Sequence, residues 1–287
     1  MVNRRASGCA LVALGLSLCF ELQAADRFAY RAKVVEIEEL THDTKRIRFH
    51  LMDAKGFAFT PGQYTLLKVP DDYVRQWNAR YKTTHEEVAR PYSFATSSSR
   101  LPLFDLMIKH AGPPPGKGVP PGIASTYVHT KLKAGDDVSF SAPVGNLYLR
   151  KDTGRPIVIV AGGTGVAPFL SLLEYWFENQ FEKNNEIYFF FGVRSRRDLF
   201  LHERFQGWAQ AKAKFHYIPA LSNPAPADNW KGETGLLQLI VDKHVAAPSD
   251  GDAYLAGPPM MVREVVKVLN AKGIGKDRIH TDPIAVR

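Results

Sequence analysis

Apolar and polar positions divide the chain into two regions with different periods. In the first region, about residues 27–150, apolar and polar residues alternate over short segments. Within residues 45–51, for example, Ile47, Phe49 and Leu51 lie on one face. Similar short segments predict strands at residues 33–37, 65–69, 103–109 and 137–140, with one helix at about residues 125–132. Short strands at this spacing, separated by turn residues, are typical of an antiparallel barrel.

The second region, about residues 151–287, alternates whole strands with helices. Residues 157–160 are continuously apolar, as in a parallel strand that is buried on both faces. Further strands are predicted at residues 186–191, 215–218 and 252–255, and helices at about residues 168–181, 198–211, 236–243 and 262–270. This alternation predicts a parallel sheet with right-handed crossovers and a ligand at the strand ends. We therefore expect a β-barrel domain followed by an α/β domain.

The N-terminal 25 residues have a separate pattern. Arg4 and Arg5 precede an apolar block at residues 10–20, and small residues follow at 23–25. This order is typical of a secretory signal, and the block is shorter than the about 20 residues that span a membrane. A cleaved signal is favoured and a retained anchor is the alternative. Basic residues on both sides leave the orientation open. We expect a cell-envelope location, either exported to the periplasm or anchored to the inner membrane.

Charge and cysteine content exclude several classes of protein. The 287 residues carry a formal net charge of +8, but Lys and Arg are spread along the chain and accompany no nucleic-acid-binding motif. We therefore expect no nucleic-acid partner. Cys9 and Cys19 are the only cysteines, so residues after 20 cannot form a cysteine-ligated iron–sulfur cluster or a thiolate zinc site. The nine histidines have no metal-like spacing, and we expect no metal site.

A glycine-rich loop joins the first strand of the second region to its first helix. Gly163, Thr164 and Gly165 follow the strand almost at once, and Pro168 opens the helix. Proline is well tolerated there because its missing N–H would be unpaired anyway. In a strand–loop–helix unit of this kind, a dinucleotide phosphate can approach the backbone amides. The loop therefore predicts a dinucleotide site.

A second motif, Arg90-Pro91-Tyr92-Ser93, lies in the first region. Arginine offers forked, charge-assisted bonds to phosphate, tyrosine a flat apolar face, and serine a hydroxyl that donates or accepts. Alone, the motif is more simply a strand that enters from a loop. Residues 122–126 provide a helix start downstream, where free N–H groups can hold a pyrophosphate. Together the two segments predict a flavin cradle.

These motifs resemble those of the ferredoxin–NADP reductase superfamily. Within it, the chain is most similar to the flavin-and-NADH part of the F component of the sodium-translocating NADH:quinone oxidoreductases. The resemblance covers nearly everything after residue 30. It rests on residues 61–64, 90–93, 113–115, 119–122, 133–136, 143–145, 162–165, 220–224, 228–230 and 257–261.

The resemblance implies how the first domain binds FAD. Arg90 would neutralise the pyrophosphate, Tyr92 would pack on the isoalloxazine, and Ser93 would hydrogen-bond near the flavin N5. The phosphates would be capped by Gly122, Ser125 and Thr126. Residues 71–89 are either a helical insertion found in the same relatives or a surface excursion without a role.

The resemblance also implies how the second domain binds a nicotinamide dinucleotide. The nicotinamide and pyrophosphate would be bordered by Gly163, Thr164 and Gly165, the adenosine side by Arg194 and Ser195, and the hydride-transfer end by Gly257, Pro258 and Pro259. Ser93 and Thr164 are the residues expected beside the reacting atoms. Arg194, Arg196 and Arg197 could suit the 2′-phosphate of NADPH. The close relatives use NADH, which is therefore favoured.

The chain departs from the family pattern in three places. Ala256 stands where many members have a cysteine beside the nicotinamide, and residues 280–287 lack the aromatic residue that often covers the flavin. The two-iron ferredoxin domain of the F-component relatives has no counterpart here, so we do not expect membership of a sodium pump. Ala256 is expected to slow hydride transfer, and the absence of the covering aromatic residue is expected to leave the flavin more open.

The resemblance implies a flavoprotein reductase that passes electrons from NADH, or less favourably NADPH, through FAD to an external acceptor. A ferredoxin, a cytochrome, a quinone and a membrane redox partner are all compatible, and the N-terminal segment could bring the chain to a membrane. One alternative is a non-catalytic flavin-bound electron-transfer subunit of a membrane or periplasmic complex that does not itself use nicotinamide. Another is a relic that binds a dinucleotide only as a ligand.

Overall fold

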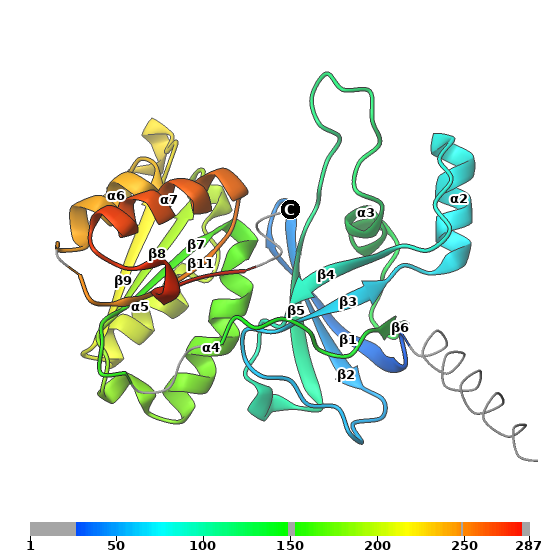
Figure 1. Cartoon of the computed structure of the whole chain (residues 1–287). Coiled ribbons are helices and arrows are strands. Elements are labelled where there is room, and N and C mark those ends of the chain that lie inside the picture. Colours follow the sequence, from blue (N-terminus) through cyan, green and yellow to red (C-terminus); the bar gives the residue numbers. More distant parts are fainter. Residues whose placement is uncertain (1–26, 149–152, 248, 283–287) are drawn as a thin grey trace, which may run out of the picture.

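The computed structural model describes residues 27–148, 153–247 and 249–282, which form two β-sheet domains side by side (Figure 1). The predicted two-domain fold is confirmed, with an antiparallel barrel followed by a parallel α/β sheet. The predicted signal or anchor at residues 1–25 lies outside the described residues. Within those residues, no helix combines the length and apolar character needed to cross a membrane.

Six antiparallel strands make the barrel, in the order β4-β3-β6-β1-β2-β5. Their bounds are β1 Tyr30–Thr41, β2 Thr44–Leu51, β3 Tyr64–Lys68, β4 Ala89–Ser93, β5 Leu103–Lys109 and β6 Asp137–Phe140. The two outer strands meet just beyond β4, because Phe94 bridges to Leu106 and the Ala95 amide donates to the Asp105 carbonyl at 2.8 Å. This contact closes the barrel around a core rich in phenylalanine.

The strand predicted at residues 33–37 extends over twelve residues as β1. Its pairing with β2 shifts register between Val34 and Glu36 and again between Glu39 and Thr41. A bulge reverses the faces to which later side chains point, so a long bulged strand shows only a short alternating segment. β2 has no such interruption over its predicted alternation, and Ile47, Phe49 and Leu51 are all buried as expected.

Two helices accompany the barrel, α2 at Asp71–Tyr81 and α3 at Ile123–Thr130. α2 occupies the segment for which a helical insertion and a surface excursion were both open. Val74 and Trp77 are buried in the barrel core, and the Tyr73 ring lies 5.2 Å from that of Tyr127 on α3. The helix is therefore packed into the domain rather than free on its surface.

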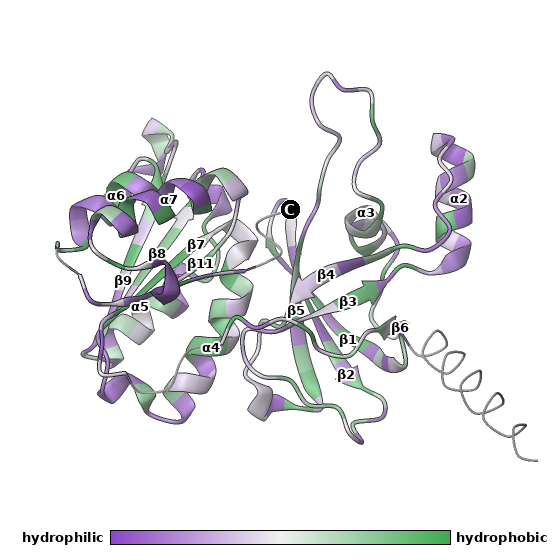
Figure 2. Ribbon diagram, viewed as in Figure 1, coloured by the Kyte–Doolittle hydropathy of each residue, from purple (hydrophilic) through white to green (hydrophobic). Residues whose placement is uncertain are grey.

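The second sheet has six parallel strands in the order β10-β9-β8-β7-β11-β12. Their bounds are β7 Ile157–Gly162, β8 Ile187–Val193, β9 Phe215–Leu221, β10 Glu233–Thr234, β11 Asp252–Ala256 and β12 Ile279–Thr281. The helices are α4 Ala167–Glu178, α5 His202–Ala211, α6 Leu237–His244 and α7 Pro259–Ala271. Ile157 and Ile159 of β7 pack toward α4 and α5, whereas Val158 and Val160 pack toward α6 and α7. Buried faces on both sides explain the apolar strands of Figure 2.

Two features of this domain differ from the sequence-based expectation. The helix predicted from residue 198 begins only at His202, because residues 196–198 form a 3-10 turn (η4). The Ser195 amide and hydroxyl both donate to the Asp198 carboxylate. Ser195 and Asp198 form a capping box at the start of this separate turn. The short edge strands β10 and β12 were not predicted.

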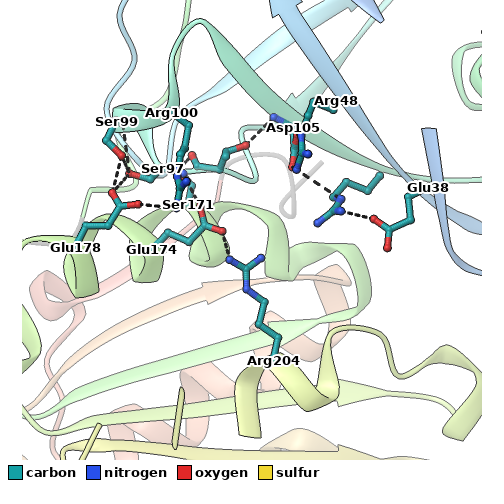
Figure 3. A network of polar contacts seen from close by, with 12 residues as sticks. Glu38, Arg48, Ser97, Ser99, Arg100, Asp105, Ser171, Glu174, Glu178 and Arg204 are labelled. Atoms are coloured by element: carbon teal, nitrogen blue, oxygen red, sulfur yellow. Dashed lines mark hydrogen bonds and ion pairs between the residues drawn. The ribbon is translucent and has the colours of Figure 1, made fainter. Parts of the chain in front are cut away.

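α4 makes both apolar and polar contacts with the barrel. Ala95, Met107 and Leu147 of the barrel belong to the same buried cluster as the apolar residues of α4. Beside this cluster, the Ser97 amide donates to Glu174 at 2.8 Å and the Ser97 hydroxyl to Glu178 at 2.6 Å (Figure 3). These contacts fix the orientation of one sheet relative to the other.

The polar part of this interface includes the Glu178 carboxylate. Burial would raise the pKa of Glu178, but the hydroxyls of Ser97 and Ser99 and the nearby Arg100 guanidinium lower it below its ordinary value. Glu174 in turn is paired with Arg204 of α5, so α4 is tied both to the barrel and to its own sheet (Figure 3).

Two glycines of the second domain, Gly207 in α5 and Gly192 in β8, test how closely its helices pack on the sheet. Gly207 is exposed, and a Cβ built there meets no heavy atom within 4 Å. Gly207→Ala should therefore raise the free energy of unfolding by about 0.5–1 kcal/mol, measured by urea denaturation. At Gly192 of β8 a Cβ would lie 2.5 Å from Leu237 Cδ1, so Gly192→Ala should destabilise the protein. Equal effects at the two positions would contradict the packing described.

Candidate functional site

A pocket of about 580 Å³ opens at the carboxyl ends of β7, β8 and β9. The second domain lines it with Thr164 after β7, Arg194 after β8, Ser222 after β9, and Leu237 and Pro258 at the starts of α6 and α7. This is the edge of a parallel sheet where ligands are expected to bind. Of the predicted nucleotide-binding residues, Gly163, Thr164, Arg194 and Pro258 line the pocket directly.

The predicted glycines bring two loops into backbone contact. A Cβ at Gly165 would lie only 2.4 Å from the Ala256 carbonyl oxygen at the end of β11. Gly257 has a φ of +145°, and a Cβ there would lie 2.9 Å from the Gly162 amide nitrogen. Gly163 has a φ of +54°. Gly165 and Gly257 therefore act by letting the two loops touch, and the predicted Pro259 follows as the first residue of α7.

The turn after β8 holds the remaining predicted residues of the adenosine side. Arg194 is exposed, while the Ser195 hydroxyl is engaged by the Asp198 carboxylate at 2.6 Å. Arg197 and Asp198 themselves line the pocket. Ser195 thus shapes the turn, and the side chains available to a ligand are Arg194, Arg197 and Asp198.

The barrel supplies the opposite wall of the same pocket, which the sequence did not predict. The β1–β2 turn contributes residues 41–44, and Lys109 contributes from the end of β5. The Lys109 ammonium lies 3.1 Å from Asp43 Oδ2, and His42 Nδ1 lies 3.8 Å from Asp198 Oδ1 across the domain boundary. The pocket is therefore built by both domains.

Asp43 is the anchor of this wall. Burial would raise the pKa of Asp43, but the ammonium of Lys109 and the hydroxyls of Thr41 and Thr44 hold it below its ordinary value. The carboxylate therefore stays charged at neutral pH and keeps Lys109 at the pocket edge.

The residues predicted to bind a flavin gather on β4 and at the start of α3. Arg90 is exposed, its Nη1 donates to the Ala89 carbonyl at 2.8 Å, and it forms no ion pair with another described residue. Tyr92 is half-buried against the barrel core, and burial raises its pKa to about 12. An exposed guanidinium that forms no ion pair among the described residues, close to a neutral aromatic ring, suits a phosphate-bearing planar ligand.

The start of α3 lacks a side-chain cap. Gly122 is the N-cap residue and makes no side-chain bond to the first turn. The Ser125 hydroxyl donates to the Gly122 carbonyl and accepts from the Ala111 amide, both at 3.0 Å, while Thr126 Oγ1 lies 3.3 Å from His110 Nε2. The backbone amides of the first turn, rather than the Ser125 hydroxyl, are thus left to receive a phosphate.

Ser93 connects the two predicted sites through a residue that the sequence did not indicate. Its hydroxyl donates to Asp282 Oδ2 at 3.3 Å, and the Asp282 amide donates to the Leu255 carbonyl of β11 at 2.9 Å. The next residue of β11, Ala256, is the one that Gly165 approaches. Ser93 therefore lies at the strand ends that also carry the glycine loop with Thr164.

The departures from the family pattern are only partly visible. Ala256 is fully buried in the core beneath the glycine loop. Of residues 280–287, where the family often has an aromatic that covers the flavin, 283–287 lie outside the described part of the chain. Among the described residues, no group of three or more His, Cys, Asp or Glu side chains is placed to hold a metal ion.

Comparison with known proteins gives matches to both halves. The family described as "Oxidoreductase FAD-binding domain" matches residues 31–148, and "Oxidoreductase NAD-binding domain" matches residues 159–267. The F component of the Na(+)-translocating NADH-quinone reductase of Serratia proteamaculans is 32% identical over 282 residues, which cover 88% of this chain and 68% of the relative. The F component of the Yersinia enterocolitica reductase is 34% identical with the same coverage of each chain.

Solved structures with a similar fold include two reductases. The Amycolatopsis cytochrome P450 reductase GcoB superposes with a TM-score of 0.72 at 27% identity, covering 89% of this chain and 69% of the other. The ferredoxin reductase of carbazole 1,9a-dioxygenase superposes with a TM-score of 0.68 at 25% identity and the same coverage. Both domains therefore match oxidoreductases along nearly the whole described chain.

Proposed function

Since the chain belongs to the ferredoxin–NADP reductase family, as a homologue of the F component of the Na⁺-translocating NADH-quinone reductases, we propose that its interdomain pocket binds NADH beside an FAD held by the barrel. The chain is an FAD-dependent NAD(P)H oxidoreductase. The arrangement is supported by the pocket at the strand ends, which both domains line, and by the separate Ser93–Asp282 bond, which joins β4 to the second domain.

Arg90 and the first-turn amides of α3 hold the FAD pyrophosphate in this proposal, and Tyr92 packs against the ring system. The exposed Arg90 guanidinium and the helix start without a side-chain cap support these roles. Bound FAD supplies hydride acceptance and the release of electrons singly or in pairs. The Ser93 hydroxyl, oriented by the Asp282 carboxylate, hydrogen-bonds the flavin edge.

The nucleotide is held by residues of both domains. Gly163 and Thr164 border its pyrophosphate and nicotinamide, and Pro258 closes the hydride-transfer end. Lys109, which Asp43 keeps at the pocket edge, adds a positive charge for the phosphates from the barrel side. Since hydride transfer needs alignment of two rings, the fixed domain interface supports the same role.

NADH is the preferred donor in this proposal. Asp198 lies in the turn after β8, where its carboxylate can accept ribose hydroxyls and would repel a 2′-phosphate. Arg194 and Arg197 would favour NADPH, but Asp198 is held in place by Ser195 whereas Arg194 and Arg197 are exposed. We therefore keep Arg194 on the adenosine side, as the resemblance implies, and assign neither arginine to a 2′-phosphate.

Electrons leave to an external acceptor, such as a ferredoxin, a cytochrome, a quinone or a membrane redox partner. The relatives named as a quinone reductase and a P450 reductase support this range. The apolar block near the N-terminus supports a cell-envelope location, exported or anchored. The same block favours one second candidate, an exported electron-transfer subunit that does not use nicotinamide itself.

An anaerobic titration of the full-length chain, reconstituted with FAD, tests these proposals. NADH should bleach the flavin absorption, and NADPH should do so only at higher concentration. A yellow protein that NADH does not bleach would support the electron-transfer subunit instead. A chain that takes up no flavin at all would refute both.

A further inference from the structure

The only sulfur atoms of the described residues belong to methionines. Both cysteines lie within the first 20 positions of the sequence, outside the described ranges. Met260 is 60% exposed and Met52 is 50% exposed, whereas Met107 is buried and Met261 is half-buried. A small oxidant in solution therefore reaches Met260 and Met52 first.

Met260 lies in the wall of the interdomain pocket. It is the second residue of α7 and lines the pocket together with Pro258 and Met261. The Arg263 guanidinium contacts its sulfur. A Cβ built on Gly162 would lie 2.7 Å from the Met261 sulfur, so Met261 rests directly on the end of β7. The methionine pair thus forms an apolar surface at the end of the pocket nearest Pro258.

Met52 provides an internal comparison. It follows the last residue of β2, whereas Thr44 at the first end of the same strand lines the pocket. Eight residues of extended chain at about 3.3 Å each put Met52 about 26 Å from Thr44. The two methionines are therefore similarly exposed but differ in distance from the nucleotide site.

We propose that Met260 is an oxidation site that reversibly weakens nucleotide binding. Hydrogen peroxide transfers one oxygen atom to the Met260 sulfur, which is oxidised by two electrons to the sulfoxide, while the peroxide is reduced to water. Oxygen chemistry is within the range of flavins, so peroxide is an oxidant to which such a protein is exposed. The proposal rests on the proposed function for the identity of the nucleotide.

The sulfoxide changes the pocket wall in a defined way. It replaces the thioether of Met260, which lies beside Pro258 and Met261 in the pocket wall, with a polar and larger sulfoxide group. Because a ligand that covers Met260 must then displace water from a polar sulfoxide, the affinity for the dinucleotide falls. Methionine sulfoxide reductases restore the thioether, so the loss of nucleotide affinity is reversible.

The test treats the full-length FAD-reconstituted chain with hydrogen peroxide, with and without saturating NAD⁺. Sulfoxides are mapped by peptide mass spectrometry, and NAD⁺ affinity is measured by calorimetry. We expect oxidation at Met260 and Met52 but not at Met107, with NAD⁺ protecting Met260 alone. Affinity for NAD⁺ should fall about threefold to tenfold and recover after treatment with sulfoxide reductases.

Two variants assign the effect to one residue. In Met260→Leu, peroxide should leave the NAD⁺ affinity at that variant's own untreated value, whereas Met52→Leu should lose affinity as the parent does. Unchanged affinity with Met260 fully oxidised would overturn the proposal, as would an equal loss in Met260→Leu. The untreated chain separates the two proposals, because failure to bind NAD⁺ there overturns the proposed function as well.

Discussion

Replacing Arg90 by alanine should release the flavin and leave the fold intact. The guanidinium is exposed on β4 and has no ionic partner among the described residues, so its removal leaves no buried charge unpaired. Charge-assisted bonds to a phosphate contribute about 1.5–3 kcal/mol, which corresponds to an about 10- to 100-fold loss of FAD affinity. Flavin fluorescence measured on titration with FAD gives this affinity directly.

Arg155→Ala is the control for position. Arg155 is also an exposed arginine, but it precedes β7 and lies at the amino ends of the parallel strands, opposite the pocket. Its guanidinium lies 4.0 Å from the buried Asp252 carboxylate, so its removal affects that ion pair and not a flavin contact. FAD affinity should be unchanged there. Wild-type affinity in Arg90→Ala would show that the flavin site has been assigned to the wrong residues.

Adding one methyl group at Gly165 should nearly stop reduction by NADH while the protein stays yellow. The new Cβ would lie 2.4 Å from the Ala256 carbonyl oxygen and 2.6 Å from the Gly257 amide nitrogen, and neither backbone can move without shifting the loop that carries Pro258. A displacement of about 1 Å between reacting groups costs about 100-fold in rate. Stopped-flow measurement of flavin bleaching should show a fall in kcat/KM of about this size.

Gly207→Ala, which adds the same methyl group in open space on α5, is the comparison for this experiment. Its rate of flavin reduction should equal that of the parent. A Gly165→Ala protein that is reduced at the parental rate would mean that the contact between the two loops does not align the nucleotide.

Local patterns were sufficient for strands whose own residues show which of their faces are buried. β7 was predicted because both of its faces are covered, and β2 because one face is. β12 was missed because three residues carry no readable period, and their extended form depends on pairing with β11, far away in sequence. The predicted helix start at residue 198 was wrong because Leu199 is extended and Leu201 has a left-handed backbone, which separates the 3-10 turn from α5.

The candidate site divides in the same way. The glycine loop and the Arg90–Ser93 motif were found because close contact between backbones requires glycines, and phosphate binding favours arginine, within a few consecutive residues. Lys109 and the turn at residues 41–44 reach the pocket only through the packing of one domain on the other. Asp282 meets Ser93 because β12 extends the sheet toward β4, a contact between residues 189 positions apart. Nothing adjacent to these residues in sequence indicates their partner.

The shared core under α4 limits how such reductases can be recombined. Side chains of the second domain cover Ala95, Met107 and Leu147 of the barrel. Either domain made alone would therefore expose an apolar patch to solvent. A chimera that joins this barrel to the nucleotide-binding domain of another protein should stay soluble only if the α4 of this chain is kept with the barrel. Domain exchanges in this family are therefore expected to keep α4 and the barrel residues that it covers together, and to vary the outer strands.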